Sequence, residues 1–397
     1  MNLERLLVVG AGPVGLHAAL HAEAAGFDVS VLERDDIGSA VQRWSHVRLF
    51  TPFSMNSTRA GRQAAGEESD LPHPDELLTG ADYVARYLRP LGECRELSGR
   101  IRTRAEVVAV SRRNFGKQHH IRQPERADSP FRILLRGIHG QEEIVECDVL
   151  LDCTGFTSRH RFIGAGGIPC PGERDWLKSA DYEIVDPARP VWREAQHVVV
   201  IGSGYSAATS VCLLHDAGLR TTWITRGDRS HPVLPVENDS LLERRSLTNR
   251  ANDLACREDA AVTWLPGPLV DVICKTSNGL QLTMSMPDGR QKQIVCDRIV
   301  ANPGYRPDSR PFEELQIDRC YATEGPVRLA AHLLDETAGD CLNQTAACPD
   351  LLQNPEPGFF IVGAASYGRD SRFLLQNGLR QVEQIVESIL AGREVLQ

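Results

Sequence analysis

Strand-forming, glycine-rich and helical stretches follow one another in the same order in two parts of the chain. Residues 6–34 read as a short apolar strand, a glycine turn, a helical stretch and a second strand that ends at Glu33. Residues 198–226 repeat this order. A strand that leads through a tight turn into a helix and then into another strand is typical of a βαβ unit with a parallel sheet. The pattern therefore predicts an α/β protein that contains this unit twice.

The first repeat carries its glycines at the spacing of a dinucleotide-binding turn. Gly10 permits a tight turn, Gly12 lets the backbone approach a pyrophosphate, and Gly15 lets the helix pack closely on the strands. The N-terminus of the helix adds amide hydrogens and a partial positive charge. Glu33, at the end of the second strand, is placed to accept hydrogen bonds from an adenosine ribose. The residues expected to bind this cofactor are Gly10, Gly12, Pro13, Val14, Gly15, Glu33 and Arg34.

The second repeat differs from the first at the end of its second strand. There, Thr225 followed by Arg226 takes the place of Glu33. A carboxylate would repel a 2′-phosphate, whereas a hydroxyl with guanidinium groups at Arg226 and Arg229 would bind it. The first site therefore suits the plain ADP moiety of FAD, and the second suits NADPH over NADH. The residues expected in the second site are Gly202, Gly204, Tyr205, Ser206, Ala207, Thr225 and Arg226.

The repeat extends beyond the two nucleotide units. Residues 147–156 align without a gap on residues 296–305, and each segment reads as a buried strand that ends in a glycine turn. Each segment follows an alternating stretch, roughly 105–145 and 262–294, that reads as a small antiparallel meander. Two nucleotide modules with matching meanders imply two cofactors in one chain.

These repeats predict two Rossmann-like domains of three layers each, with the NADPH domain inserted in the FAD domain. We expect the discontinuous FAD-binding domain over residues 1–163 and 304–397. The NADPH-binding domain then spans residues 164–303, with a hinge rich in glycine and proline at 164–196. An apolar run at 357–364 predicts the last strand, and a helix with apolar residues at helical spacing follows it.

Charge and hydropathy limit the partners of the protein. The chain has 44 basic and 53 acidic residues, a net charge of −9, so bulk attraction to nucleic acid or to an anionic membrane is not expected. A basic run from Arg100 to Arg126 is interpreted as the solvated face of a hairpin. No apolar stretch is long enough to cross a bilayer, and the first residues lead straight into a strand without a signal peptide. We expect a cytoplasmic protein, a monomer or homodimer, that acts on a small-molecule substrate.

The eleven cysteines are scattered, without a CxxC pair and without zinc-type spacing. This distribution favours reduced thiols in a cytoplasm-like compartment, with no disulfide framework and no metal site. Cys147 and Cys153 lie on or near one buried strand, where a small hydrophobic thiol is the expected role.

The chain resembles flavoproteins with two dinucleotide-binding domains, and among them the flavin-containing monooxygenases of the YUCCA type. The second glycine turn matches that group's GxGxSA pattern, and the block from Trp44 to Pro52 is similar to the stretch that runs beside the isoalloxazine. Glycine turns at 154–155 and 303–308 resemble the interdomain turns, and the segment 363–367 resembles the closing flavin-binding segment. The resemblance implies FAD and NADPH as cofactors. It adds these cofactor-binding residues: Trp44, Thr51, Pro52, Thr154, Gly155, Gly304, Tyr305, Gly363, Ala364 and Tyr367.

The resemblance implies a single-component monooxygenase that acts through a flavin peroxide, formed with O2, on a small sulfur or nitrogen nucleophile or a carbonyl. Arg48 and Asn56 are its candidate catalytic residues. The sequence departs from the group at Trp176, which stands where the monooxygenase signature has a histidine. Two alternatives therefore stay open: an NADPH-dependent flavin reductase or oxidase, and a flavoprotein kept for redox sensing. The thioredoxin-reductase branch shares the architecture but carries paired redox cysteines, which this chain lacks.

Overall fold

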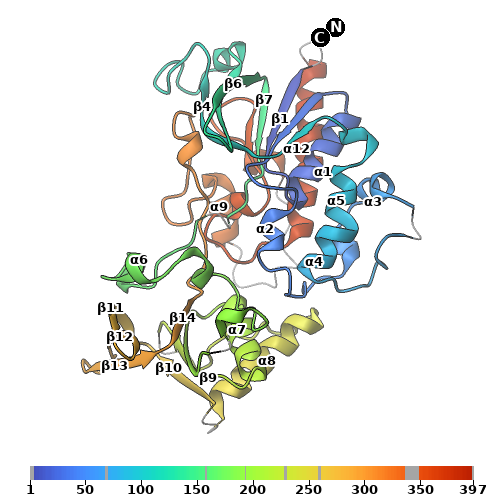
Figure 1. Ribbon diagram of the computed structural model, residues 1–397. Coiled ribbons are helices and arrows are strands. Elements are labelled where there is room, and N and C mark those ends of the chain that lie inside the picture. The colour runs from blue at the N-terminus through green and yellow to red at the C-terminus, as the bar shows by residue number, and fades with distance from the viewer. Residues whose placement is uncertain are drawn as a thin grey trace. The chain divides into compact units, whose positions relative to one another are not determined.

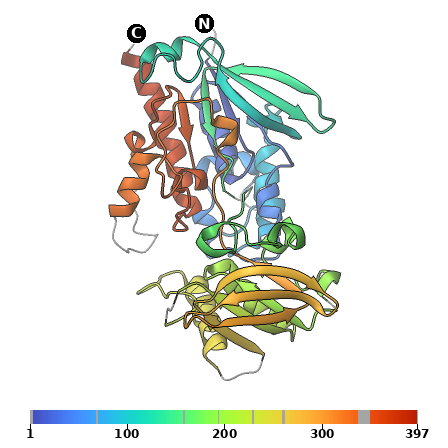
Figure 2. The ribbon, with the colours of Figure 1, turned by 90° about the vertical axis from the view of Figure 1, so that its left-hand side faces the viewer.

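The chain folds into two units, each with its own parallel sheet (Figure 1). The computed structural model describes residues 4–67, 70–156, 159–192, 194–227, 230–257, 261–335 and 348–395. The first unit is Met1–Arg159 with Arg306–Gln397, and the second is His160–Tyr305. Each unit also has a three-stranded antiparallel sheet, visible for both in Figure 2. The predicted fold class, two Rossmann-like α/β domains with one inserted in the other, is confirmed.

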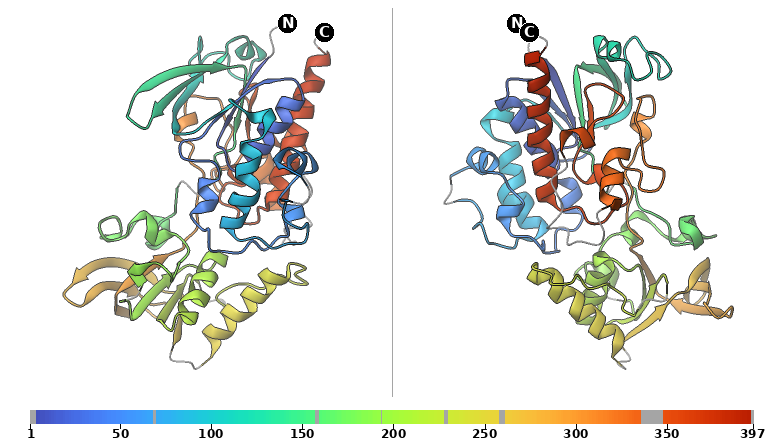
Figure 3. Two further views of the ribbon diagram at one scale, coloured as in Figure 1. Left: turned by 45° about the vertical axis from the view of Figure 1, so that its right-hand side comes forward. Right: turned by 180° about the vertical axis from the view of Figure 1, so that it is seen from behind.

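The first unit is built on five parallel strands in the order β15–β7–β1–β2–β3. Its elements are β1 (Arg5–Val9), α1 (Pro13–Ala24), β2 (Asp28–Leu32), α2 (Ser39–Gln42), α3 (Arg59–Ala65), α4 (Gly80–Tyr83), the π-helical η3 (Val84–Leu88), α5 (Arg89–Gly92), β3 (Ile101–Arg102), β4 (Ala105–Arg112), β5 (Phe131–Gly137), β6 (Glu142–Cys147), β7 (Val149–Asp152), α9 (Val327–Asp335), α10 (Pro349–Leu352), β15 (Phe359–Ile361), α11 (Ala364–Tyr367) and α12 (Leu375–Val395). Leu6 and Val8 of β1 pack in one hydrophobic cluster with α1 and α12, which run side by side in Figure 3. Leu7 and Val9 pack in a second cluster with the meander β4–β5–β6. Alternate residues of β1 therefore pack against the helical layer on one face of the sheet and against the meander on the other.

The second unit has four parallel strands in the order β10–β9–β8–β14. Its elements are α6 (Glu173–Trp176), β8 (His197–Ile201), α7 (Tyr205–Asp216), β9 (Arg220–Thr225), α8 (Leu242–Cys256), β10 (Val262–Pro266), β11 (Leu269–Thr276), β12 (Gly279–Ser285), β13 (Gln291–Cys296) and β14 (Arg298–Ala301). The predicted meander over 262–294 is wrong at its start, because residues 262–266 form β10, which pairs in parallel with β9. The antiparallel meander is β11–β12–β13. Within the ranges described, no helix is long and apolar enough to cross a membrane.

The two parallel sheets repeat one another residue by residue. Leu6 pairs with Val149 in the first unit, and Val198 pairs with Arg298 in the second. This register agrees with the gapless alignment of 147–156 on 296–305. The central strand of each sheet therefore leads into its glycine turn beside the same neighbouring strand.

Part of the predicted hinge is anchored in the second unit. The buried carboxylate of Glu173 accepts hydrogen bonds from the amides of Ile163 and Cys170, at 2.9 and 3.0 Å, and from the hydroxyl of Tyr182 at 2.8 Å. A buried amide requires a partner, and here one side chain satisfies two amides of an irregular segment. Residues 163–182 are thus held in place by a side chain of the same segment.

The basic run from Arg100 to Arg126 is not a uniformly solvated face, which corrects the interpretation from sequence. Arg112 and Arg126 are 3% and 0% exposed. Both bind the carboxylate of Glu356, with Nε of Arg112 at 2.8 Å and Nη2 of Arg126 at 2.7 Å. Burial by itself raises the pKa of Glu356, but hydrogen bonds from Arg126, Gln316 N and Arg112 outweigh burial and hold it below its ordinary value. Glu356 lies more than two hundred residues from both arginines, so no local pattern announces the cluster.

We expect Glu356→Gln to lower the free energy of unfolding by about 3–5 kcal/mol, because it leaves two buried guanidinium groups without a counter-charge. Because the folded pKa of Glu356 is depressed, its contribution is complete above the ordinary carboxyl pKa of 4.5 and is lost as the pH falls through the folded value. The difference between wild type and variant should therefore shrink in acid. Denaturant unfolding at several pH values measures both effects.

Glu142→Gln is the control, because Glu142 pairs with Arg136 at the surface. We expect a change of less than about 1 kcal/mol there. Equal losses in the two variants would contradict the importance of the buried cluster.

Candidate functional site

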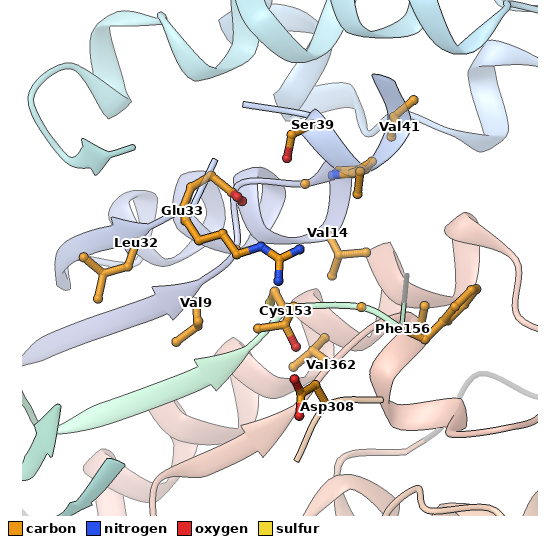
Figure 4. Close-up of a pocket in the computed structure, with 18 of the residues that line it drawn as sticks. Val9, Val14, Leu32, Glu33, Ser39, Val41, Cys153, Phe156, Asp308 and Val362 are labelled. Carbon is orange, nitrogen blue, oxygen red and sulfur yellow. The ribbon is translucent and has the colours of Figure 1, made fainter. Parts of the chain in front are cut away.

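A cavity of about 350 Å³ lies in the first unit, where the parallel strands end at their carboxyl edge. Ligands of open α/β sheets bind at this edge. In Figure 4, Glu33, Ser39 and Val41 lie on one side of the cavity, and Cys153 and Val362 lie on the other. The sequence-predicted residues that line it are Gly10, Gly12, Pro13, Val14, Glu33, Arg34, Trp44, Thr154, Gly155 and Ala364.

The glycine turn forms an open cradle at the start of α1. Gly12 has extended backbone, with φ −81° and ψ −175°, and no heavy atom lies within 4 Å of the place that a Cβ would occupy. Gly15, in contrast, does not line the cavity. A Cβ there would meet the carbonyl oxygen of Gly10 at 1.9 Å, so this position packs tightly against the turn. The turn therefore offers free space next to backbone amides, as a pyrophosphate requires.

The carboxylate of Glu33 is held in place at the cavity. One oxygen accepts a hydrogen bond from the amide of Ala11 at 2.8 Å, and the other accepts one from the amide of Asp35 at 2.9 Å. An ionised carboxylate has about four acceptor positions, so further hydrogen bonds from a ribose remain available. The geometry fits the ADP half of FAD.

The rest of the cavity is largely apolar. Trp44, Leu49, Val362, Phe373 and Leu375 line it. Such a wall excludes water and suits a flat aromatic ring system. The residues of this cavity therefore fit both halves of FAD.

Asp152, which the sequence analysis missed, fixes the turn that carries Thr154 and Gly155. The amide and the hydroxyl of Thr154 donate to one oxygen of Asp152, at 3.1 and 2.6 Å. Burial raises the pKa of Asp152, although the hydrogen bonds from Thr154 oppose this rise. An aspartate at the end of a buried strand, two residues before a Thr-Gly pair, is the signal that could have identified it.

The structure does not bring the two candidate catalytic residues to this cavity. Asn56 is 3% exposed; its amide nitrogen donates to the carbonyl of Thr51, and its amide oxygen accepts from the Thr51 hydroxyl at 2.9 Å. Asn56 and Thr51 therefore bind one another and stabilise their own loop. Arg48 is exposed, and neither Arg48 nor Pro52 lines the cavity.

Gly363 and Tyr367 contact residues near the cavity without lining it themselves. The amide of Gly363 donates to Oε1 of Gln381 at 2.8 Å, and the ring of Tyr367 packs on Phe373 with ring centres 5.2 Å apart. Neither residue lines the cavity, although Ala364 between them does.

The second glycine turn has the same open geometry in the second unit. No heavy atom lies within 4 Å of a Cβ built on Gly204, which precedes α7. Tyr205, Ser206 and Ala207 form the first turn of α7. The carbonyl of Gly202 accepts a hydrogen bond from the indole of Trp223 at 2.7 Å, which fixes the turn on β9.

At the end of β9, Arg226 is the group that a ligand can reach. Thr225 is 2% exposed, and its hydroxyl accepts a hydrogen bond from the indole of Trp264 at 2.9 Å. The Thr225 hydroxyl keeps its own donor, but the side chain is buried, whereas Arg226 is exposed. The exposed Arg226 donates to the carbonyls of Phe162 and Gly164, at 3.0 and 3.1 Å. Arg229 lies outside the described residues.

The turn at Gly304 and Tyr305 belongs to the same unit. The hydroxyl of Tyr305 donates to the carbonyl of Tyr182 at 3.0 Å, and the amide of Arg161 donates to the carbonyl of Gly304 at 2.9 Å. These bonds join the turn to the segment that Glu173 holds.

Cys153 lines the cavity as a buried thiol. Burial raises the pKa of Cys153 well above its ordinary value. Cys147 is buried in the second hydrophobic cluster, on the opposite face of the sheet, whereas Cys153 belongs to the first. Across the described ranges, every cysteine is free.

Comparisons with known proteins match most of the chain. The sequence profile of the pyridine nucleotide-disulphide oxidoreductase family matches residues 4–322. Mercuric reductase of Staphylococcus aureus is 22% identical over 367 residues, and the match spans 91% of this chain but 58% of the longer reductase. Glutathione reductase of a Nostoc species is 22% identical over 368 residues, with 90% of this chain and 67% of the reductase covered.

Solved structures share the fold over nearly the whole chain. The bacillithiol disulfide reductase Bdr (YpdA) of Bacillus cereus is 19% identical with a TM-score of 0.71, and the match covers 98% of this chain and 100% of that one. The ornithine hydroxylase PvdA of Pseudomonas aeruginosa is 14% identical with a TM-score of 0.63, and the match covers 98% and 99%. At these identities the likeness concerns the fold.

We expect Gly12→Val to give a folded protein without FAD. The extended backbone of Gly12 accepts a valine, and the side chain would enter the free space that the pyrophosphate needs. The visible absorption of the purified variant, with its circular dichroism, checks both parts.

Gly10→Val is the matched comparison. A Cβ on Gly10 would lie 2.7 Å from the carbonyl oxygen of Cys153, so this variant should lose stability as well as FAD. A yellow Gly12→Val protein with one FAD per chain would overturn the assignment of the cavity.

Proposed function

Since this chain belongs to the pyridine nucleotide-disulphide oxidoreductase family, whose members are FAD- and NAD(P)-dependent oxidoreductases, we propose that it transfers electrons from NADPH through FAD directly to a small substrate. No cysteine pair takes part. The observation that carries this proposal is the state of Cys153, a buried thiol with a raised pKa whose nearest neighbour in sequence, Cys147, packs on the other face of the sheet.

The chain's own residues bind and orient the cofactors. FAD supplies the hydride acceptance and the electron transfer that no side chain can perform. Gly12 and the start of α1 would hold the pyrophosphate, Glu33 would hold the ribose, and the apolar wall would keep water from the ring. Gly204 and Arg226 would provide the corresponding contacts for NADPH in the second unit.

Monooxygenation of a small sulfur, nitrogen or carbonyl substrate is the first candidate for the second half of the reaction. It is favoured by the resemblance of the 44–52 block to flavin-containing monooxygenases, since Trp44 and Leu49 of this block line the cavity. A hydroxylase among the solved structures shares the architecture.

Reduction of another acceptor, or of O2 to hydrogen peroxide, is the second candidate. It is favoured by Trp176, 43% exposed at the end of α6 in place of the signature histidine, and by the inward amide of Asn56. Oxygen uptake and hydrogen peroxide yield separate the candidates. A thioether or amine that lowers the peroxide yield while NADPH consumption continues supports oxygenation, whereas one peroxide per NADPH with every substrate supports the oxidase.

Anaerobic titration should consume one equivalent of NADPH per FAD, because two electrons fully reduce the flavin and no dithiol accepts two more. The flavin absorbance at each addition gives the end point. Cys147→Ser and Cys153→Ser should leave it unchanged. A second equivalent that disappears in either variant would place a redox dithiol in the protein and contradict the proposal.

Arg226→Ala should raise the Michaelis constant for NADPH about tenfold and leave that for NADH nearly unchanged. A charge-assisted bond is worth about 1.5–3 kcal/mol, and we take the lower end because Arg226 is exposed. Stopped-flow reduction of the flavin with each nucleotide measures the effect.

Arg226→Lys is the control, since it keeps the charge and should retain part of the preference. Equal effects of Arg226→Ala on both nucleotides would show that this residue does not read the 2′-phosphate.

A further inference from the structure

A second cavity, of about 290 Å³, lies in the first unit. One wall is the segment on both sides of Asn56, from Ser54 to Arg59 at the start of α3. The other wall is α12, with Leu379, Arg380 and Glu383 on one face of the helix. At the start of α12, Leu375 lines the first cavity and the next residue, Gln376, lines the second.

The charged side chains of the second cavity do not neutralise one another. Arg59, Arg380 and Glu383 line it, and none of them forms a hydrogen bond or an ion pair with another residue in the described part of the chain. Arg62, one turn after Arg59 in α3, instead donates to the hydroxyl of Ser57 at 2.9 Å. The lining therefore offers two free guanidinium groups and one free carboxylate, which leaves one net positive charge.

The floor of this cavity is fixed and partly apolar. Leu379 is 4% exposed and Ser57 is 6% exposed. The Ser57 hydroxyl donates to the carbonyl of Phe53 at 2.8 Å while it accepts from Arg62, so its position is set by the loop. Met55 and Leu379 give the carbon body of a ligand an apolar surface.

We propose that the second cavity binds the carboxylate of a small, singly charged substrate between Arg59 and Arg380. The inference rests on the proposed function, because it assigns the small substrate of that reaction to the second cavity. Guanidinium groups pair well with carboxylates, and Glu383 disfavours ligands with a second negative charge, such as phosphate esters. Met55 and Leu379 contact the uncharged part of the substrate.

Calorimetric titration of the FAD-loaded protein with phenylacetate, phenylacetamide and phenyl phosphate tests this site. Phenylacetate should bind about tenfold more tightly than the neutral amide and more tightly than the doubly charged phosphate. Arg59→Gln and Arg380→Gln should each remove most of the difference between acid and amide.

Two further variants separate charge recognition from damage to the structure. Glu383→Gln should tighten phenylacetate two- to threefold, because it removes a repulsive charge, whereas a damaged site would bind less well. Arg95→Gln changes an exposed arginine outside the cavity and should have no effect. Equal binding of acid and amide to the wild type, or no heat of binding with phenylacetate, overturns the proposal.

NADPH titration of the same preparation tests the proposed function independently of ligand binding to the second cavity. If NADPH reduces the flavin with one equivalent but phenylacetate does not bind, the second cavity is not the carboxylate site and the flavin-only reaction stands. If a second equivalent is consumed, the proposed function fails whatever the calorimetry shows.

Discussion

The close passage of a glycine backbone over the end of a neighbouring strand is the constraint on which both glycine turns depend. In the first unit a Cβ on Gly10 would lie 2.7 Å from the carbonyl oxygen of Cys153, and in the second a Cβ on Gly202 would lie 2.2 Å from that of Asn302. Both glycines have positive φ, which a side chain rarely adopts. Since α1 and α7 begin three residues after these glycines, the direction of their N-terminal amides follows from the two contacts. One backbone geometry, used twice, creates both cradles.

Buried or held carboxylates then fix the loops around these cradles. Glu33 satisfies the amides of Ala11 and Asp35, Asp152 satisfies that of Thr154, and Glu173 satisfies those of Ile163 and Cys170. Irregular segments leave backbone amides that secondary structure cannot satisfy, and an unsatisfied buried amide costs about 1–3 kcal/mol. These carboxylates are therefore a condition for ordered loops at the sites.

The sequence allowed the fold to be predicted because its signals are local. The glycine spacing, the strand before it and the helix after it lie within thirty residues, and the gapless alignment of 147–156 on 296–305 extended them to the neighbouring strands. The errors concern residues whose partners are set by tertiary structure. Thr225 is buried and accepts a hydrogen bond from Trp264 of the adjacent strand β10, and the buried Arg126 pairs with the distant Glu356. Asn56 is the exception, since its partner Thr51 is near in sequence. A single sequence does not distinguish an asparagine that stabilises its own loop from an asparagine that faces a cofactor.

The charge at the end of the second strand of each repeat separates the two cofactors because it is held in position. A free carboxylate could turn away from a 2′-phosphate, but both oxygens of Glu33 are bound by backbone amides, so its negative charge would stay in place and repel the phosphate. Arg226 is a held positive charge at the equivalent position. Its Nη2 donates to two carbonyls, and the N–H groups of its other nitrogens stay available for a phosphate. Such preorganisation lowers the entropic cost of binding the right nucleotide and raises the electrostatic cost of binding the wrong one. We therefore attribute the expected assignment, FAD to the first unit and NADPH to the second, to two held charges of opposite sign at equivalent positions of an internal repeat.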